Sequence, residues 1–300
     1  HIVRAININN LSIAYEEIHG KGTFTVWEKD ANAHLEKLKK MSHSARKKYL
    51  NRNNHWAKLY PALSKLSDGK CWYSESPANS SEWEIEHYRP KMKSKAEDGS
   101  VIRTDGYWWL SYYWKNFRLA GTLVNKIRRD RFKIDSKPFG KGNFFPLDLN
   151  NGGVIAVPYD NHCGCETTYL LDPIVPRDTQ YISFDENGDA IENADPNDDD
   201  FNFKRAQLSI YFYGLNHTPV VKARKQIWET CKNEIELAHN YFKNKSIPQK
   251  LRETYIEQCY NKIFEMSRGD QPYSSVVFAY VRFKKQDYQW LDGLYDVISK

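Results

Sequence analysis

Two kinds of hydrophobic pattern divide the first part of the chain. Residues 1–15 partly alternate apolar and polar positions, which predicts a strand. Apolar residues recur at helical spacing over residues 27–50 and again over residues 55–66, with lysines on the opposite face of the first segment. These segments are therefore expected to be helices, and Asp68-Gly69 is expected to end the second one.

The middle of the chain holds an aromatic run over residues 107–114. Such a run of large side chains favours core packing over base stacking.

The last part of the chain is expected to be mostly helical. Residues 185–189 predict the turn of a hairpin, and residues 195–200 an acidic linker or a helix N-terminal cap. The helical segments expected after it are 203–213, 219–244, 248–266 and shorter pieces up to residue 300. The predicted fold class is α+β, in a mainly helical chain. The predicted parts are residues 1–69, 70–175 and 176–300.

Composition agrees with a folded protein. The 300 residues are 40% hydrophobic and 14% aromatic, with a formal net charge of +6. No apolar run reaches the length of a membrane span and no signal peptide is recognised, so a cytoplasmic protein without a membrane partner is expected. The five cysteines are too scattered to indicate a disulfide framework.

A basic region indicates a polyanionic partner. Lysines and arginines outnumber acids between residues 89 and 141. The densest cluster is Lys126, Arg128, Arg129, Arg131 and Lys133. Such a cluster suits nucleic acid, although it can also be a solvated face.

Residues 84–91 carry the most specific chemistry of the chain. They read Glu-Ile-Glu-His-Tyr-Arg-Pro-Lys. A carboxylate can hold a divalent ion, an imidazole can take a proton from water, and the cations can hold a phosphate. This combination is what metal-assisted cleavage of a phosphodiester requires.

The surrounding segments give the motif a context. Cys71-Trp72-Tyr73-Ser74 precedes it, and residues 114–125 (WKNFRLAGTLVN) and 143–147 (NFFPL) follow it. In this order the segments resemble an HNH (ββα-metal) endonuclease core. Such a small ββα core is a hairpin followed by a helix, so the resemblance implies a first strand at residues 84–88, a turn or second strand at residues 119–124 and a helix from residue 125 to residue 132. The resemblance is closest to the HNH subunit, PtuB, of Septu-type anti-phage systems, including those attached to retrons, and it covers about residues 56–172 well.

The resemblance implies roles for four residues. His87 would be the general base, and the alternative is a structural histidine paired with a neighbouring glutamate. Glu86 and Asn125 would hold Mg²⁺ or Mn²⁺, and Asn125 could instead cap a helix. Asn116 would brace the loop and orient the histidine. In this family the aromatic run at residues 107–114 is a helix beside the site.

Three further residues are weaker site candidates. Arg89 and Lys91 could hold substrate phosphates or could be ordinary surface charges. Glu166 matches a family glutamate ahead of a Leu-Asp-Pro segment. It could approach the active site or cap the following strand.

The chain departs from the family at its structural zinc site. The family usually has two Cys-x-x-Cys pairs that bind zinc. Here Cys71 remains, whereas Ser74, Gly121 and Val124 stand at the other positions. Structural zinc is therefore predicted to be absent, with packing in its place. The side chains expected to supply that packing are Trp72, Tyr73, Phe117 and Leu119. Cys163-Gly164-Cys165 has too tight a spacing to predict a second zinc site.

Two functions remain open from the sequence. The first is a metal-dependent HNH endonuclease, the effector of an anti-phage defence complex, cutting DNA or RNA, including tRNA. Its implied partners are nucleic acid, an SMC- or ABC-type ATPase and, in retron-linked systems, a reverse transcriptase with its RNA–DNA hybrid. The second is a degenerate HNH subunit that binds nucleic acid or acts as a scaffold without cutting.

Overall fold

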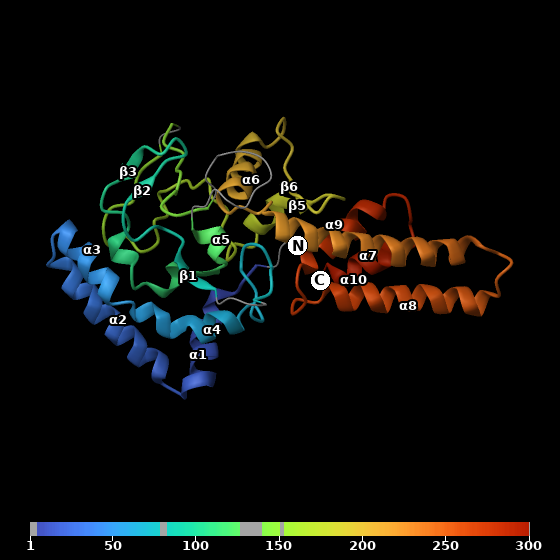
Figure 1. Ribbon diagram of the computed structural model, residues 1–300, viewed down its shortest axis with the longest axis horizontal. Coiled ribbons are helices and arrows are strands. Elements are labelled where there is room, and N and C mark those ends of the chain that lie inside the picture. Colours follow the sequence, from blue (N-terminus) through green and yellow to red (C-terminus); the bar gives the residue numbers. More distant parts are fainter. Residues whose placement is uncertain (1–4, 79–82, 127–139, 151–152, 300) are drawn as a thin grey trace.

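The computed structural model describes residues 5–78, 83–126, 140–150 and 153–299. Four helices form the N-terminal part (Figure 1): α1 (Leu11–His19), α2 (Thr23–Lys39), α3 (His43–Arg52) and α4 (Tyr60–Lys65). The strand predicted over residues 1–15 is wrong from residue 8 onward, because a 3₁₀ turn at Ile8–Asn10 leads directly into α1. Residues 1–4 of that prediction lie outside the described residues.

Helical spacing explains the failed strand prediction. Leu11, Ala14 and Tyr15 are the buried residues of α1, and they lie three and four positions apart. The alternation of apolar and polar residues extended over only a few positions, so it was a weaker signal than the helical spacing of these buried residues. The helix predicted over residues 27–50 is correct in type, but Ser42 adopts an extended backbone and divides it into α2 and α3. Serine commonly precedes a helix start, and α3 begins at the next residue.

A two-stranded antiparallel pair forms the centre of the middle region. β1 (Glu84–His87) pairs with β4 (Phe117–Ala120), from Glu84 opposite Ala120 to His87 opposite Phe117. The short helix α5 (Thr122–Asn125) follows β4 directly. The predicted helix start at Asn125 is wrong, since α5 ends there, and residues 127–132 of that prediction lie outside the described residues.

The long insertion between β1 and β4 is folded against this pair. It contains a small hairpin of β2 (Ser94–Lys95) and β3 (Val101–Arg103). The aromatic run is not the single helix that was expected. It forms two 3₁₀ turns, Trp108–Leu110 and Trp114–Asn116. The four consecutive residues 107–110 are all buried, which the single apolar face of a surface helix does not provide.

The C-terminal part matches its prediction closely. β5 (Ile182–Phe184) and β6 (Ala190–Glu192) form the expected hairpin. Asp199 caps α6 (Asp200–Phe212) by accepting a hydrogen bond from the Asn202 amide. The remaining helices are α7 (Thr218–Lys243), α8 (Gln249–Ser267), α9 (Ser274–Lys284) and α10 (Leu291–Ile298). α7 and α8 run side by side and project away from the strands (Figure 1).

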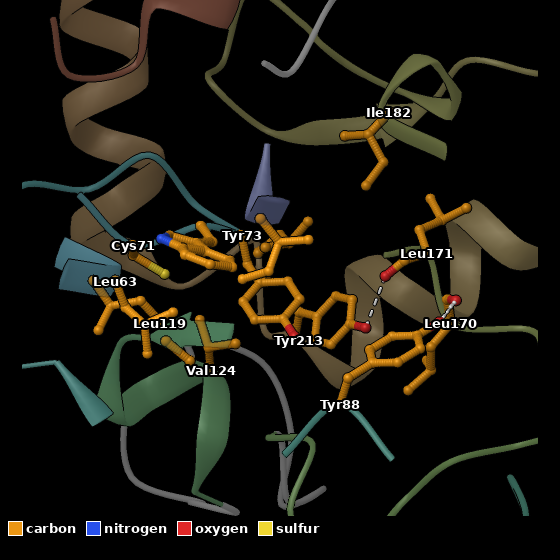
Figure 2. Close-up of a cluster of buried hydrophobic side chains, with 14 of the residues drawn as sticks. Leu63, Cys71, Tyr73, Tyr88, Leu119, Val124, Leu170, Leu171, Ile182 and Tyr213 are labelled. Atoms are coloured by element: carbon orange, nitrogen blue, oxygen red, sulfur yellow. Dashed lines mark hydrogen bonds between the residues drawn. The ribbon is translucent and has the colours of Figure 1, made fainter. Parts of the chain in front are cut away.

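A buried aromatic cluster joins the middle region to the C-terminal part (Figure 2). The Tyr73 and Tyr213 rings lie 4.2 Å apart. The Tyr213 hydroxyl donates to the Leu171 carbonyl at 2.8 Å, and the Tyr88 hydroxyl donates to the Leu170 carbonyl at 2.6 Å. Tyr88 is the residue directly after β1, so this core fixes the end of the strand that carries the motif. Within the described ranges, no helix is both long and apolar enough to span a membrane.

Candidate active site

β1 sorts the motif side chains onto two faces. Successive residues of a strand point to opposite sides, so Glu84 and Glu86 share one face and His87 lies on the other. Antiparallel pairing with β4 holds all three side chains in place. Glu86 and His87, the expected metal ligand and the expected base, therefore lie on opposite faces of β1.

His87 is almost completely enclosed, with 6% of the residue exposed. Its ring contacts Trp56 and Phe117 edge to face, at centroid distances of 4.9 and 5.0 Å. Nε2 lies 3.0 Å from the Ser111 carbonyl oxygen. A carbonyl can only accept, so Nε2 carries the proton and Nδ1 holds the free lone pair. Burial lowers the pKa of His87 well below its usual range, and the nearby Lys91 charge lowers it further, so the ring is neutral.

Glu86 is held by two buried groups. Its carboxylate accepts a hydrogen bond from the Tyr73 hydroxyl and forms an ion pair with the Lys141 ammonium. The side chains of Glu86 and Lys141 are 2% and 0% exposed. Lys141 also donates to the His87 carbonyl at 3.1 Å. Sequence reasoning did not select Lys141 as a site residue, because a lysine 55 positions after its carboxylate partner has no local signal.

Asn125 lies beside Glu84 and not beside Glu86. Its Nδ2 donates to Glu84 Oε2 at 2.9 Å, and Lys126 Nζ lies 2.5 Å from Glu84 Oε1. The Glu84 side chain is 30% exposed, so this pair lies near the surface. The structure thus gives the two proposed metal ligands different partners, Lys141 for Glu86 and Glu84 for Asn125.

Asn116 holds the backbone directly after His87. Its Oδ1 accepts from the Arg89 amide at 2.9 Å, and its Nδ2 donates to the Arg89 carbonyl at 3.0 Å. The Tyr88 amide donates to the Asn116 carbonyl at 2.9 Å. These contacts join the end of β1 to the start of β4. Asn116 therefore holds the backbone of the loop that follows His87.

Arg89 is engaged within the protein. Its Nε lies 2.9 Å from Glu166 Oε2, and Glu166 also accepts from the Tyr107 hydroxyl at 2.8 Å and the Ala156 amide at 3.0 Å. The Glu166 side chain is 0% exposed. Glu166 therefore neutralises Arg89 and anchors two segments. It does not cap a strand.

Lys91 differs from Arg89 because it makes no ion pair with the described residues. Its ammonium lies 4.8 Å from the Trp56 ring centroid. Burial lowers the pKa of Lys91 to about 8, with a further contribution from the Lys141 charge. An ammonium without a carboxylate partner beside His87 can accept an anionic ligand.

The side-chain oxygens around β1 meet some of the requirements of a divalent metal site. Glu84, Glu86 and Asn125 offer the carboxylate and amide oxygens that Mg²⁺ and Mn²⁺ prefer. However, Lys141 already neutralises Glu86, so an ion at this carboxylate would have to displace the ammonium. Across the part of the chain that the structure describes, no three His, Cys, Asp or Glu side chains form a metal-binding group.

Of the four positions of the family zinc site, Cys71 and Gly121 are in contact, whereas the Ser74 hydroxyl lies 2.8 Å from the Ser76 hydroxyl. The Cys71 thiol is buried and accepts from the Gly121 amide at 3.3 Å. Leu63, Leu119 and Val124 lie around it (Figure 2). The four side chains expected to supply packing are all buried: Trp72, Tyr73, Phe117 and Leu119.

Two other features of the sequence were the cysteine segment at residues 163–165 and a basic cluster. Cys163 is buried with its thiol 3.2 Å from the Asp160 carbonyl, and Cys165 is exposed. In the basic cluster, Lys126 pairs with Glu84. Arg128, Arg129, Arg131 and Lys133 lie outside the described residues.

Comparison with known proteins supports the resemblance seen in the motifs. The chain is 23% identical to the Septu protein PtuB of Bacillus mycoides (strain KBAB4) over 229 residues, which is 72% of this chain and 70% of that protein. A 65-residue stretch is 38% identical to a thermolabile hemolysin of Vibrio parahaemolyticus serotype O3:K6 (strain RIMD 2210633), but it covers only 13% of that protein. No family model and no solved structure matches. Similarity along most of its length thus relates the chain to a Septu protein.

Proposed function

We propose that this chain is a metal-dependent endonuclease of the HNH type and a subunit of an anti-phage defence complex. The similarity to a Septu protein supports the defence role. One structural relationship carries the proposed activity. His87 is the last residue of β1, and Asn116 lies 29 positions further along the chain. The Asn116 side chain forms hydrogen bonds with the backbone of Arg89, two residues after His87.

His87 would act as the general base through Nδ1. The Ser111 carbonyl holds Nε2 and fixes the tautomer, as a base that must accept a proton at one defined atom requires. The lowered pKa keeps this nitrogen unprotonated at neutral pH. Asn116 would act as a positioning residue, because it holds the backbone next to the base.

Lys91 would hold the substrate phosphate, whereas Arg89 would support the loop. Lys91 has no carboxylate partner among the described residues, and Arg89 is paired with Glu166. Glu86 and Asn125 would hold Mg²⁺ or Mn²⁺, with Glu84 beside Asn125. A bound ion would polarise the phosphate and stabilise the charge of the leaving oxygen.

A second function has its own supporting observation. Glu86 is neutralised by Lys141, and His87 is enclosed between Trp56 and Phe117. A subunit that has lost catalysis, and that binds nucleic acid or supports a complex, would tolerate both features. An active enzyme would have to open this region around its substrate.

A cleavage assay separates the two functions. Wild-type protein is incubated with Mg²⁺ and, separately, with duplex DNA, single-stranded DNA and tRNA. The His87→Ala variant should lose cleavage, whereas His162→Ala, at an exposed histidine outside the site, should retain it. Equal cleavage by both variants would contradict the assignment of the base. No cleavage of any substrate by the wild type would favour the non-catalytic subunit.

The proposed partner in the complex is an ATPase of the SMC or ABC type. Most of the apolar stripe of α7 is used internally, with Cys231, Ile235 and Ala238 buried. Phe242 of α7 and Leu251 of α8 remain 47% and 46% exposed near the end of the projecting pair (Figure 1). Co-expression with a neighbouring ATPase, followed by pull-down and sizing, tests this partner. A monomer that cuts at full rate beside the ATPase would contradict a regulated complex.

A further inference from the structure

A long stretch of the N-terminal part carries only positive charge. Residues 37–58 contain eight lysines and arginines and no aspartate or glutamate. The stretch covers the end of α2, all of α3 and the turn before α4. A solvated helix face normally mixes the two signs, so such an imbalance indicates a polyanionic ligand.

Most of these cations are available for binding. Six are exposed and form no ion pair with a described residue: Lys37, Lys40, Lys47, Lys48, Arg52 and Lys58. The carboxylates that reach the stretch come from outside it. Glu36 lies 2.5 Å from Lys39, and Asp105 lies 2.8 Å from His43 and 3.7 Å from Arg46.

Aromatic side chains from other segments fix part of this surface. The Arg46 guanidinium lies 3.8 Å from the Trp108 ring centroid, and its Nε donates to the Leu38 carbonyl at 3.0 Å. Lys39 Nζ lies 5.3 Å from the ring of Tyr159, which is 54% exposed. Cation–π contacts of this kind favour defined positions over free motion of the side chains. We call the exposed lysines and arginines of residues 37–58, with Arg46 and Lys39, the α2–α3 surface.

The α2–α3 surface leads to the candidate active site. Asn53, just after α3, accepts a hydrogen bond from the Tyr112 hydroxyl at 2.7 Å. Trp56, near the end of the basic stretch, contacts the His87 ring at 4.9 Å and lies under the Lys91 ammonium at 4.8 Å. The segment that carries the unpaired cations therefore ends near Trp56, a side chain that contacts His87, the proposed base.

We propose that the α2–α3 surface binds the phosphate backbone of the nucleic acid and guides it toward His87. This inference rests on the proposed nuclease function and adds a binding surface outside the cutting site. The repeated negative charges of a phosphate backbone can contact several of these lysines and arginines at once. An acidic protein would be recognised by the same charges, and the experiment includes it as a competitor.

The experiment compares two triple variants with equal loss of charge. The first is Lys40→Ala, Lys47→Ala, Lys48→Ala in the α2–α3 surface. The control is Lys243→Ala, Lys245→Ala, Lys250→Ala, at exposed lysines near the far end of α7 and α8 (Figure 1). Binding of a labelled 30-base-pair DNA duplex (a length of about three helical turns) is measured in EDTA at several salt concentrations, so that no cleavage occurs. Melting temperatures check that both variants are folded.

The expected result is a change in the surface variant alone. Each lost phosphate contact lowers the slope of log affinity against log salt by about 0.9, so three lost contacts lower it by about two to three. The control should bind like the wild type. Equal weakening of both variants, unchanged binding of the surface variant, or no binding by the wild type would overturn the inference. Stronger competition by polyglutamate than by unlabelled duplex would also overturn it.

The two proposals fail in different ways. A wild-type protein that binds the duplex through this surface, but does not cut it with Mg²⁺, would disprove the nuclease and leave the surface intact. A wild-type protein that cuts, while the surface variant binds with unchanged affinity and salt dependence, would disprove the surface and leave the nuclease intact.

Discussion

The Lys141 ammonium lies against the Glu86 carboxylate, and neither side chain is more than 2% exposed. Burial lowers the pKa of Lys141, and the Glu86 charge opposes this shift. The two residues are far apart in the sequence, yet each supplies the countercharge that the other needs away from water. This pair fixes Glu86 on the face of β1 that it shares with Glu84.

Removing the ammonium should strongly destabilise the protein. Lys141→Met leaves the buried Glu86 carboxylate without a countercharge, which should lower the free energy of unfolding by about 3–5 kcal/mol. Urea denaturation measures this loss. The matched control is Lys126→Met, which breaks the pair with Glu84. Because the Lys126 side chain is 59% exposed, its loss should cost no more than about 1 kcal/mol. Similar costs for both variants would show that Glu86 does not depend on Lys141.

The Asn116 contacts should contribute more than an ordinary asparagine contact. Asn116→Ala removes both hydrogen bonds to the Arg89 backbone and leaves buried polar groups without partners. The expected loss is about 2–3 kcal/mol, by denaturant titration. Asn53→Ala removes a single bond to the Tyr49 carbonyl and should cost about 1 kcal/mol. A cost for Asn116→Ala no greater than for Asn53→Ala would refute the bracing role.

The buried neutral histidine should make stability depend on pH. The pKa of His87 is lowered in the folded protein. Below a pH of about 6.5, His87 therefore binds a proton in the unfolded chain but stays neutral in the folded chain. The free energy of unfolding should therefore be independent of this group above that pH. It should fall as the pH drops below that value, by at most about 1.4 kcal/mol per pH unit for His87.

A variant isolates the contribution of His87 from that of other histidines. Burial also lowers the pKa values of His34, His55 and His239. The His87→Gln variant should keep their contribution and show a shallower fall in unfolding free energy between pH 6.5 and 5 than the wild type. Identical slopes would mean that His87 titrates alike in the folded and unfolded states.

Packing, not zinc, should hold the segment around Cys71. Elemental analysis of the purified protein should find no stoichiometric zinc, and Cys71→Ala should not change the metal content. The variant should lose about 1–3 kcal/mol of stability, from the hydrogen bond of the Gly121 amide and the buried contacts of the thiol. Cys165→Ala, at an exposed thiol, should cost little. One zinc per chain that disappears in Cys71→Ala would contradict the prediction.

The local elements of this protein follow from its sequence. The hairpin around residues 185–189 and the long helices α7 and α8 were predictable, because periodicity and turn residues act over a few positions. The strand at residues 84–87 followed from the resemblance of its motif to the HNH core. The motif residues and the departure from four cysteines could likewise be read directly. The strand prediction at residues 1–15 failed because the short apolar pattern there fitted the two-residue period of a strand as well as the roughly 3.6-residue period of a helix.

Only the tertiary structure decided the partners of the site residues. It pairs Glu86 with Lys141, Asn125 with Glu84 and Arg89 with Glu166, over separations of 55, 41 and 77 positions. From the sequence alone, each of these side chains could bind a metal ion or a phosphate. The buried carboxylates Glu86 and Glu166 need a countercharge close in space, and chain packing decides which side chain supplies it. Local sequence patterns do not encode that packing.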